Sequence, residues 1–249
     1  MFTIRKEQME AFELASAPRF AEAARDHLKA AFPKHCAQLG ETGVRETVEY
    51  GIGKAAAYGV ITQAGASLFL DLMLLLGRGF DTDFQLPWAA EILTDAALPD
   101  EQTRISLLHT AAMEYLDKVS GPDNEFIDEA QRRIGLESTE WVSKTEPFEV
   151  YMLTRLRLIF PQKCDCLGDE ILKMLVGRAI SKARQYELKT ERGVMVLAGL
   201  LLMLGSSFDT DPVFASITQV LKNQSIADQQ ARSKLLHEAS LEYLKRWCG

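Results

Sequence analysis

The chain has 249 residues and a net charge of −7, and 47% of its residues are apolar and 25% charged. This balance is ordinary for a globular protein and excludes collagen-like or low-complexity chains, while the negative charge argues against a general nucleic-acid binder, whose surface is basic. The longest apolar run, residues 194–204, has about half the length of a bilayer span, so it predicts a buried core helix. The charged start lacks the apolar core of a signal peptide. We therefore expect a cytoplasmic protein whose four cysteines are reduced thiols.

Helical periodicity, capping residues and helix breakers predict the elements of the first half. Pro33 cannot continue a helix, Thr62 is a favourable N-cap, and Gly77 suits a helix C-terminus. Asp83 and Asp100 precede two further helical segments, and we expect each to cap the helix that follows. In chain order the predicted helices cover residues 3–14, 19–32, 44–58 and 63–76, a segment after Asp83, and a segment from Asp100 to about Leu116.

The phrase Phe-Asp-Thr-Asp (FDTD) occurs twice, 128 residues apart, and the similarity extends far beyond it. No gap is needed from Leu28 to Gly121, a register too long for chance. We therefore predict an all-α fold made by tandem duplication of a roughly five-helix bundle. Its parts are an N-terminal repeat (1–121), a polar, helical connector (122–138) and a C-terminal repeat (139–249). At this offset residues 27–40 align with 155–168, 72–77 with 200–205, and 104–116 with 232–244.

The two aspartate pairs, Asp81 with Asp83 and Asp209 with Asp211, suggest either a metal site or a structural turn. Mg²⁺ and Ca²⁺ need several converging oxygen ligands, and no further acid is fixed nearby in the sequence. Because the motif repeats with the whole domain, we favour the structural interpretation. The phenylalanine would then fill the bundle core and the second aspartate would cap the next helix. A metal-dependent hydrolase that uses these loops remains an alternative.

Histidine and cysteine offer further candidates for chemistry. His109 and His237 occupy the same place in both repeats, in Leu-Leu-His-x-Ala-x-x-Glu-Tyr-Leu, and we predict that they are core histidines. Whether they do more stays open. Cys164 and Cys166 lack the spacing and the second ligand pair of a zinc site, so we predict that these thiols and their counterpart Cys36 are buried. No cofactor is expected.

Features that only one repeat carries are the best candidates for partner binding, since the shared fold does not require them. Residues 1–138 have a net charge of −9 and residues 139–249 a net charge of +2, so the two halves can dock on each other or face different partners. Asp71 lies in an otherwise apolar helix, where it is either edge-exposed or paired with Lys54 or with an arginine of a partner. The other candidates are Leu86, Pro87 and Trp88, of which Trp88 could instead fill the seam between repeats, and a basic helix face of Lys173, Arg178, Lys182 and Arg184.

Four stretches of the sequence resemble a group of small helical bacterial proteins encoded in type VI secretion gene clusters, beside spike proteins, effectors and effector-loading chaperones. The resemblance covers mainly residues 4–119. It implies a cytoplasmic co-chaperone or adaptor without enzymatic activity, whose partner is an effector-loading chaperone or the effector itself. It transfers no catalytic residue and implies neither nucleic-acid binding nor membrane insertion. An immunity protein that blocks a cognate toxin is the alternative within binding proteins, and the oligomeric state stays open. The stretches are IRKEQMEAF (4–12), HLKAAFPKHC (27–36), YGIGKAAAYGV (50–60) and LMLLLGRGFDTDFQLPWAAEIL (72–93).

Overall fold

A computed structural model describes residues 6–136, 146–223 and 225–248, and within these ranges every regular element is helical. The predicted all-α class is confirmed. The first half contains α1 (Lys6–Ala31), α2 (Pro33–Ala57), α3 (Gln63–Leu76), α4 (Pro87–Thr94) and α5 (Glu101–Ser120). The second contains α6 (Glu125–Leu136), α7 (Phe148–Ile159), α8 (Pro161–Gln185), α9 (Glu191–Leu204), α10 (Ala215–Lys222) and α11 (Gln229–Cys248). Short 3₁₀ turns cover Phe80–Thr82, Pro122–Asn124, Phe208–Thr210 and Pro212–Phe214.

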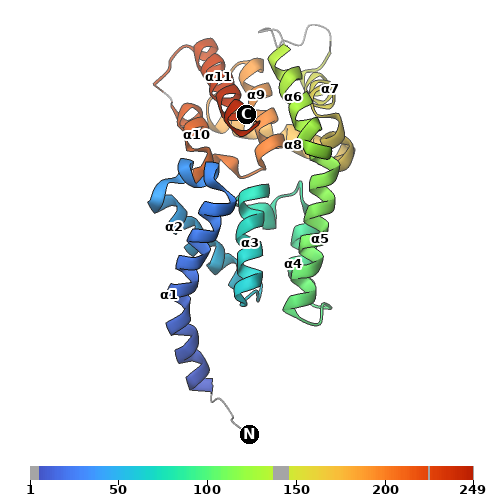
Figure 1. The fold of residues 1–249 in the computed structure, drawn as a ribbon. Coiled ribbons are helices and arrows are strands. Elements are labelled where there is room, and N and C mark those ends of the chain that lie inside the picture. Colours follow the sequence, from blue (N-terminus) through green and yellow to red (C-terminus); the bar gives the residue numbers. More distant parts are fainter. Residues whose placement is uncertain (1–5, 137–145, 224, 249) are drawn as a thin grey trace.

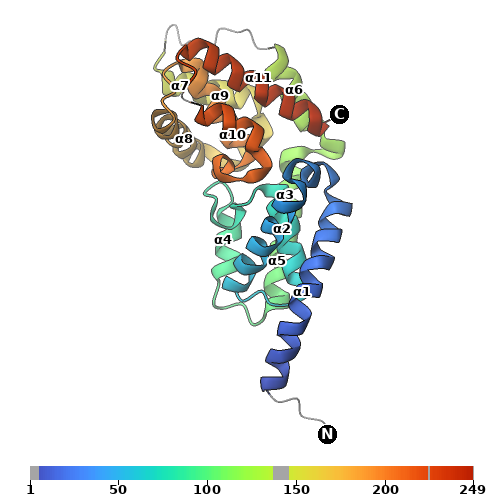
Figure 2. The same cartoon turned by 90° about the vertical axis from the view of Figure 1, so that its left-hand side faces the viewer.

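The helices form two bodies stacked end to end, as both views of the ribbon show (Figures 1 and 2). Helices α1 to α5 make one body and α7 to α11 the other. Helix α6 continues upward from the end of α5 and lies along the second body (Figure 1). The N-terminal end of α1 extends beyond the first body in both views. The two FDTD turns follow α3 and α9, the central helices of the two bodies.

The ends of α3 and α9 show why the sequence forms these helices at these places. The Thr62 hydroxyl accepts a hydrogen bond from the Gly65 N–H at 3.1 Å, and Thr190 does the same for Gly193 at 3.0 Å. Each bond satisfies an N–H group that has no partner within the helix. Both helices end at a glycine with positive φ, 100° at Gly77 and 92° at Gly205. The predicted bounds of α3 are confirmed.

Other helix bounds differ from the prediction. Helix α1 runs through the exposed Pro18, so the two segments predicted at 3–14 and 19–32 form one helix. Helix α2 begins at Pro33 rather than at residue 44, because Pro suits the first helical position. Its axis breaks at Gly40, where φ is 66° and ψ is 174°. Helix α8 breaks at the corresponding Gly168, with φ of 75° and ψ of 170°.

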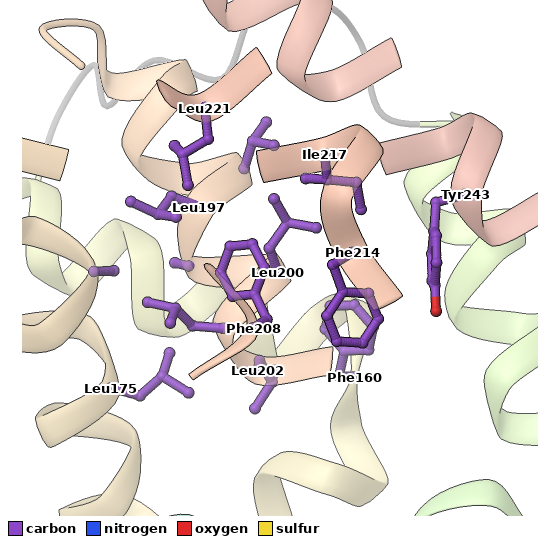
Figure 3. Packing of buried hydrophobic residues seen from close by; sticks show 14 of the residues in the cluster. Phe160, Leu175, Leu197, Leu200, Leu202, Phe208, Phe214, Ile217, Leu221 and Tyr243 are labelled. Atoms are coloured by element: carbon purple, nitrogen blue, oxygen red, sulfur yellow. The ribbon is translucent and has the colours of Figure 1, made fainter. Parts of the chain in front are cut away.

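Two hydrophobic clusters hold the described part of the molecule together. One lies within the first half and surrounds Phe80, which packs on Phe69 with 4.9 Å between ring centroids. The other surrounds Phe208 in the second half and is drawn in Figure 3. Both motif phenylalanines are 1% exposed, so the prediction that they fill the cores is confirmed. The second cluster also includes Leu28 and Leu70 of the first half, so apolar packing is continuous between the bodies.

The segment predicted as a polar connector is part of the second core. Helix α6 buries Ala130 and Ile134 in the cluster around Phe208. The Gln131 side-chain amide donates to the Leu244 carbonyl of α11 at 3.0 Å, and the Arg133 guanidinium donates to the Leu158 carbonyl of α7 at 3.0 Å. The predicted connector is therefore helical, as expected, but it packs on the second half. Residues 137–145, at the predicted boundary between connector and C-terminal repeat, lie outside the described residues.

Candidate functional site

The first aspartate of each FDTD turn is buried and binds a lysine and a tyrosine from the C-terminal end of another helix, α2 in the first half and α8 in the second. Asp81 Oδ2 accepts hydrogen bonds from Lys54 Nζ at 2.6 Å and from the Tyr58 hydroxyl at 2.8 Å. In the second half Asp209 Oδ2 binds Lys182 Nζ and accepts from the Tyr186 hydroxyl at 2.6 Å. All three residue types recur at an offset of 128. These two clusters tie α2 to the turn after α3, and α8 to the turn after α9.

The electrostatics of the clusters follow from burial. Burial of Asp209 acts to raise the pKa of its carboxyl, but the hydrogen bonds from Lys182 and Tyr186 outweigh it and the pKa is lowered. Burial, with the hydrogen bond to Asp81, raises the pKa of Tyr58 to about 12. Burial and the bond to Asp209 likewise raise the pKa of Tyr186. Both tyrosines are therefore neutral donors near neutral pH.

The second aspartate of each turn reaches across to the other half. Asp83 Oδ2 accepts the Ser206 N–H at 2.7 Å, and Asp211 Oδ2 accepts the Arg78 N–H at 2.9 Å. The other oxygens bind within their own turns, Asp83 Oδ1 to the Gln85 N–H and Asp211 Oδ1 to the Val213 N–H, each at 3.0 Å. Residues 78 and 206 are again 128 apart. The two turns thus form a reciprocal clasp between the halves.

The clasp requires a close approach of the two backbones. A Cβ on Gly77 would lie 3.1 Å from the Leu204 carbonyl oxygen, and a Cβ on Gly79 would lie 2.8 Å from Ser207 Oγ. A Cβ on Gly205 would meet the Asp83 carboxylate at 3.0 Å. Glycine is therefore needed at residues 77 and 205 both for the positive φ and for the contact between the halves.

The structure corrects one expectation about the aspartates. Asp83 binds the Gln85 N–H, but α4 begins at Pro87 with Leu86 at its N-cap position, so Asp83 does not cap that helix. The aspartates are also already bonded within the protein, which argues against metal ligation. Asp81 and Asp209 each bind an ammonium group, and Asp83 and Asp211 each accept two N–H groups. Within the ranges that the structure describes, no group of three or more His, Cys, Asp or Glu side chains is arranged to hold a metal ion. The arrangement supports a structural role for these loops.

A groove of about 570 Å³ lies beside the clasp, between the two halves. We call it the seam groove. Its walls come from the C-terminal ends of α3 and α9, from α5, α6 and α11, and from the segment around Phe160 and Phe214. Most lining side chains are apolar, and charged groups are contributed by Lys34, Lys163, Asp83, Asp123 and Asp128. Leu75, on its edge, is 45% exposed. A volume of this size suits a binding site.

The histidines and cysteines lie differently from the expectation. His109 is exposed on α5, so the prediction of a core histidine is wrong there; His237 is partly buried, and burial lowers its pKa. Cys36 and Cys164 are buried, and burial raises the pKa of Cys164 to about 12. Cys166 is exposed, contrary to the prediction, and the side chain of Cys248 lies outside the described residues.

The repeat-specific candidates separate into core and surface residues. Leu86 is 4% exposed, belongs to the core of the first half and also lines the seam groove, whereas Pro87 is exposed. Trp88 is partly buried, with its ring 6.1 Å from that of Tyr115. Asp71 does not pair with Lys54 but forms a hydrogen bond with His27 Nε2 at 2.8 Å. Burial raises the pKa of the Asp71 carboxyl, although the bond to His27 acts to lower it.

The predicted basic face of α8 loses one of its members. Lys182 is 8% exposed because its ammonium group pairs with Asp209, so it faces the interior. Arg178 and Arg184 are exposed, and Lys173 is exposed with a bond to Glu170 at 2.8 Å. The pairing was visible in the sequence, since Lys54 and Lys182 align at the same offset as the FDTD turns. A lysine that occurs in both halves at the same offset as a core motif is expected to bind the same residue of that motif in each half.

Comparison of the chain with protein-family models, with curated proteins and with solved structures finds no match. In the part of the chain that the structure describes, no helix combines the length and the apolar character that crossing a bilayer requires.

Proposed function

We propose that the chain is a tandem duplication and works as a protein–protein interaction module without catalytic activity, a co-chaperone or adaptor that assists type VI secretion effector loading in the cytoplasm. The seam groove carries this proposal. Its apolar interior with charged groups among the lining residues has the composition of a protein-binding site, in which burial of apolar surface supplies affinity and polar groups at the rim supply specificity. The sequence resemblance supplies the cellular setting and the expected occupant, a segment of an effector-loading chaperone.

Three pairs of matched interactions support the duplication. The aspartate–lysine–tyrosine clusters, the threonine caps and the clasp bonds each occur twice, at an offset of 128 residues. A duplicated bundle brings two similar helix ends together at its seam, and their C-terminal turns form one end of the groove. The groove is then a product of pairing two repeats, which a single bundle could not supply.

The negative charge of the first half favours a partner segment with basic groups. The three carboxylates that line the groove, Asp83, Asp123 and Asp128, exceed its two lysines. Complementary charge of this kind accelerates encounter and excludes wrong partners more than it adds affinity. Leu75, which is exposed at the edge and is not part of the core, offers an apolar contact to a partner.

The test is capture of the partner from native cells by the tagged chain, followed by mass identification. We expect an effector-loading chaperone or an effector from the wild type, and at least a tenfold loss of capture with Leu75→Lys, because an unpaired ammonium group that faces a basic segment at an interface costs more than about 1.4 kcal/mol. Ile61→Lys is the matched control, since Ile61 is 76% exposed and lies outside the groove. Equal loss from both variants, or capture of a lone toxin, would contradict the proposal.

A further inference from the structure

One end of the seam groove is rich in hydrogen-bond acceptors. Helices α3 and α9 both end there, at Gly77 and Gly205. The carbonyl groups of a last helical turn lack intrahelical partners and carry partial negative charge. The two ends converge: a Cβ on Gly77 would lie 3.1 Å from the Leu204 oxygen, and one on Gly205 would lie 3.5 Å from the Leu76 oxygen. The Asp83 carboxylate lines the same end.

Gln85 supplies an independent observation at this end. It lines the groove, is 3% exposed, and comes directly after the clasp residues. Its side-chain Nε2 donates to the Leu201 carbonyl at 2.8 Å, but its Oε1 is buried without a hydrogen-bond partner. Leaving such an oxygen unpaired carries a desolvation cost in the folded state. An occupant that brings an N–H donor would remove this cost, and the bond would be shielded from water.

The rest of the groove favours an aliphatic chain behind that donor. The walls beyond the acceptor end are leucine, valine, isoleucine and aromatic side chains of α5, α6 and α11. Lys34 and Lys163 are the cationic lining groups, and Asp83, Asp123 and Asp128 the anionic ones, so the lining carries one net negative charge. A fatty acid fits the walls but would place its carboxylate against acceptor oxygens. A basic side chain has an aliphatic stem and a head that only donates.

We infer that the acceptor end of the seam groove binds an arginine or lysine side chain of the partner protein, with the charged head at Gln85 Oε1 and the Asp83 end and the stem along the apolar wall. The inference rests on the proposed function for the identity of the partner as a protein. It adds which chemical group is recognised and where.

The test uses two small probes with six-carbon chains and oppositely charged head groups, n-hexylguanidinium and hexanoate, on the full-length protein. Binding is followed by amide resonances in ¹H–¹⁵N spectra. We expect n-hexylguanidinium to shift the backbone resonances of Gly77 and Gly205 and the side-chain amide of Gln85, and hexanoate to bind at least about tenfold more weakly. Equal or tighter binding of hexanoate, or guanidinium-induced shifts confined to other parts of the chain, would overturn the inference.

A variant sharpens the test. Gln85→Val places at this position the residue that the second half carries at Val213, and we expect it to weaken n-hexylguanidinium binding about tenfold. Gln162→Val, also in the lining, is the control and should bind as the wild type does. If Gln85→Val fails to fold, because it also loses the bond to Leu201, the comparison of the two probes on the wild type still decides. Probe binding without partner capture would contradict the proposed function alone, and capture without guanidinium preference would contradict this inference alone.

Discussion

Asp209→Ala is expected to lower the free energy of unfolding by about 3–5 kcal/mol, because it leaves the Lys182 ammonium buried without its counter-charge. The side chain of Lys182 is 9% exposed and that of Asp209 is 3% exposed, so little solvent reaches the pair. The Tyr186 hydroxyl would lose its acceptor as well. Urea unfolding monitored by circular dichroism measures the change.

The first half supplies a matched control for this prediction. Asp81→Ala removes the same interactions, but the Lys54 side chain is 29% exposed and remains partly hydrated. We therefore expect a smaller loss than for Asp209→Ala. The double variant Lys182→Met with Asp209→Leu should recover most of the stability, since an apolar pair can replace a buried ion pair without large cost. Equal losses at the two sites, or a loss below about 1 kcal/mol at Asp209, would mean that the ion pair is not the stabilising feature.

The second large effect is a loss of stability at mildly acidic pH that depends on His35. Burial lowers the pKa of His35 to about 4, against the opposing effect of its bond to the Leu74 backbone. The unfolded chain takes up a proton below about pH 6.5, and the folded protein does not until about pH 4. The contribution of neutral His35 to the free energy of unfolding is therefore fully present above pH 6.5 and is lost progressively as the pH falls toward 4. Between pH 7.5 and pH 5 the loss amounts to about 2 kcal/mol.

Urea unfolding of the wild type and of His35→Gln at both pH values isolates this contribution. The variant should be less sensitive to pH by about 2 kcal/mol. His109→Gln is the control, because His109 is exposed and its removal should leave the wild-type pH dependence intact. A His35 variant that loses as much stability as the wild type would assign the pH dependence to other groups.

Local signals in the sequence predicted those parts of the fold that local chemistry determines. Thr62 and Gly77 bound α3 where expected because a capping hydroxyl and a positive-φ glycine act within one turn of the helix end. The segments 3–14 and 19–32 were predicted as separate helices although α1 runs through Pro18, and the break of α2 at Gly40 was missed. The polar composition of 122–138 concealed the apolar stripe of Ala130 and Ile134, so α6 was predicted as a connector rather than as part of a core.

The candidate site was less accessible to sequence reasoning, because it depends on contacts between the halves. The repeat predicted that Phe80 and Phe208 are buried. The ion pairs could also have been predicted, because Lys54 and Lys182 recur at the same offset as Asp81 and Asp209. Nothing local shows that Asp83 reaches Ser206 or that Gln85 lies in a groove. Of the residues that only the first half carries, Leu86 is buried and Pro87 is exposed, which the sequence alone does not distinguish. Bonds of this kind follow from how two bundles dock, which no single segment encodes.

The central claim is that the repeated aspartate turns fasten the two halves and do not form a metal site. Thermal unfolding of the wild type, Asp83→Ala and Asp211→Ala, each with and without millimolar Mg²⁺ or Ca²⁺, tests it most directly. We predict that each substitution costs about 1–3 kcal/mol, because it leaves N–H groups of the clasp without an acceptor, and that neither ion changes any melting temperature. A rise in the wild-type melting temperature with either ion, abolished by the same substitutions, would contradict the claim and favour a metal centre.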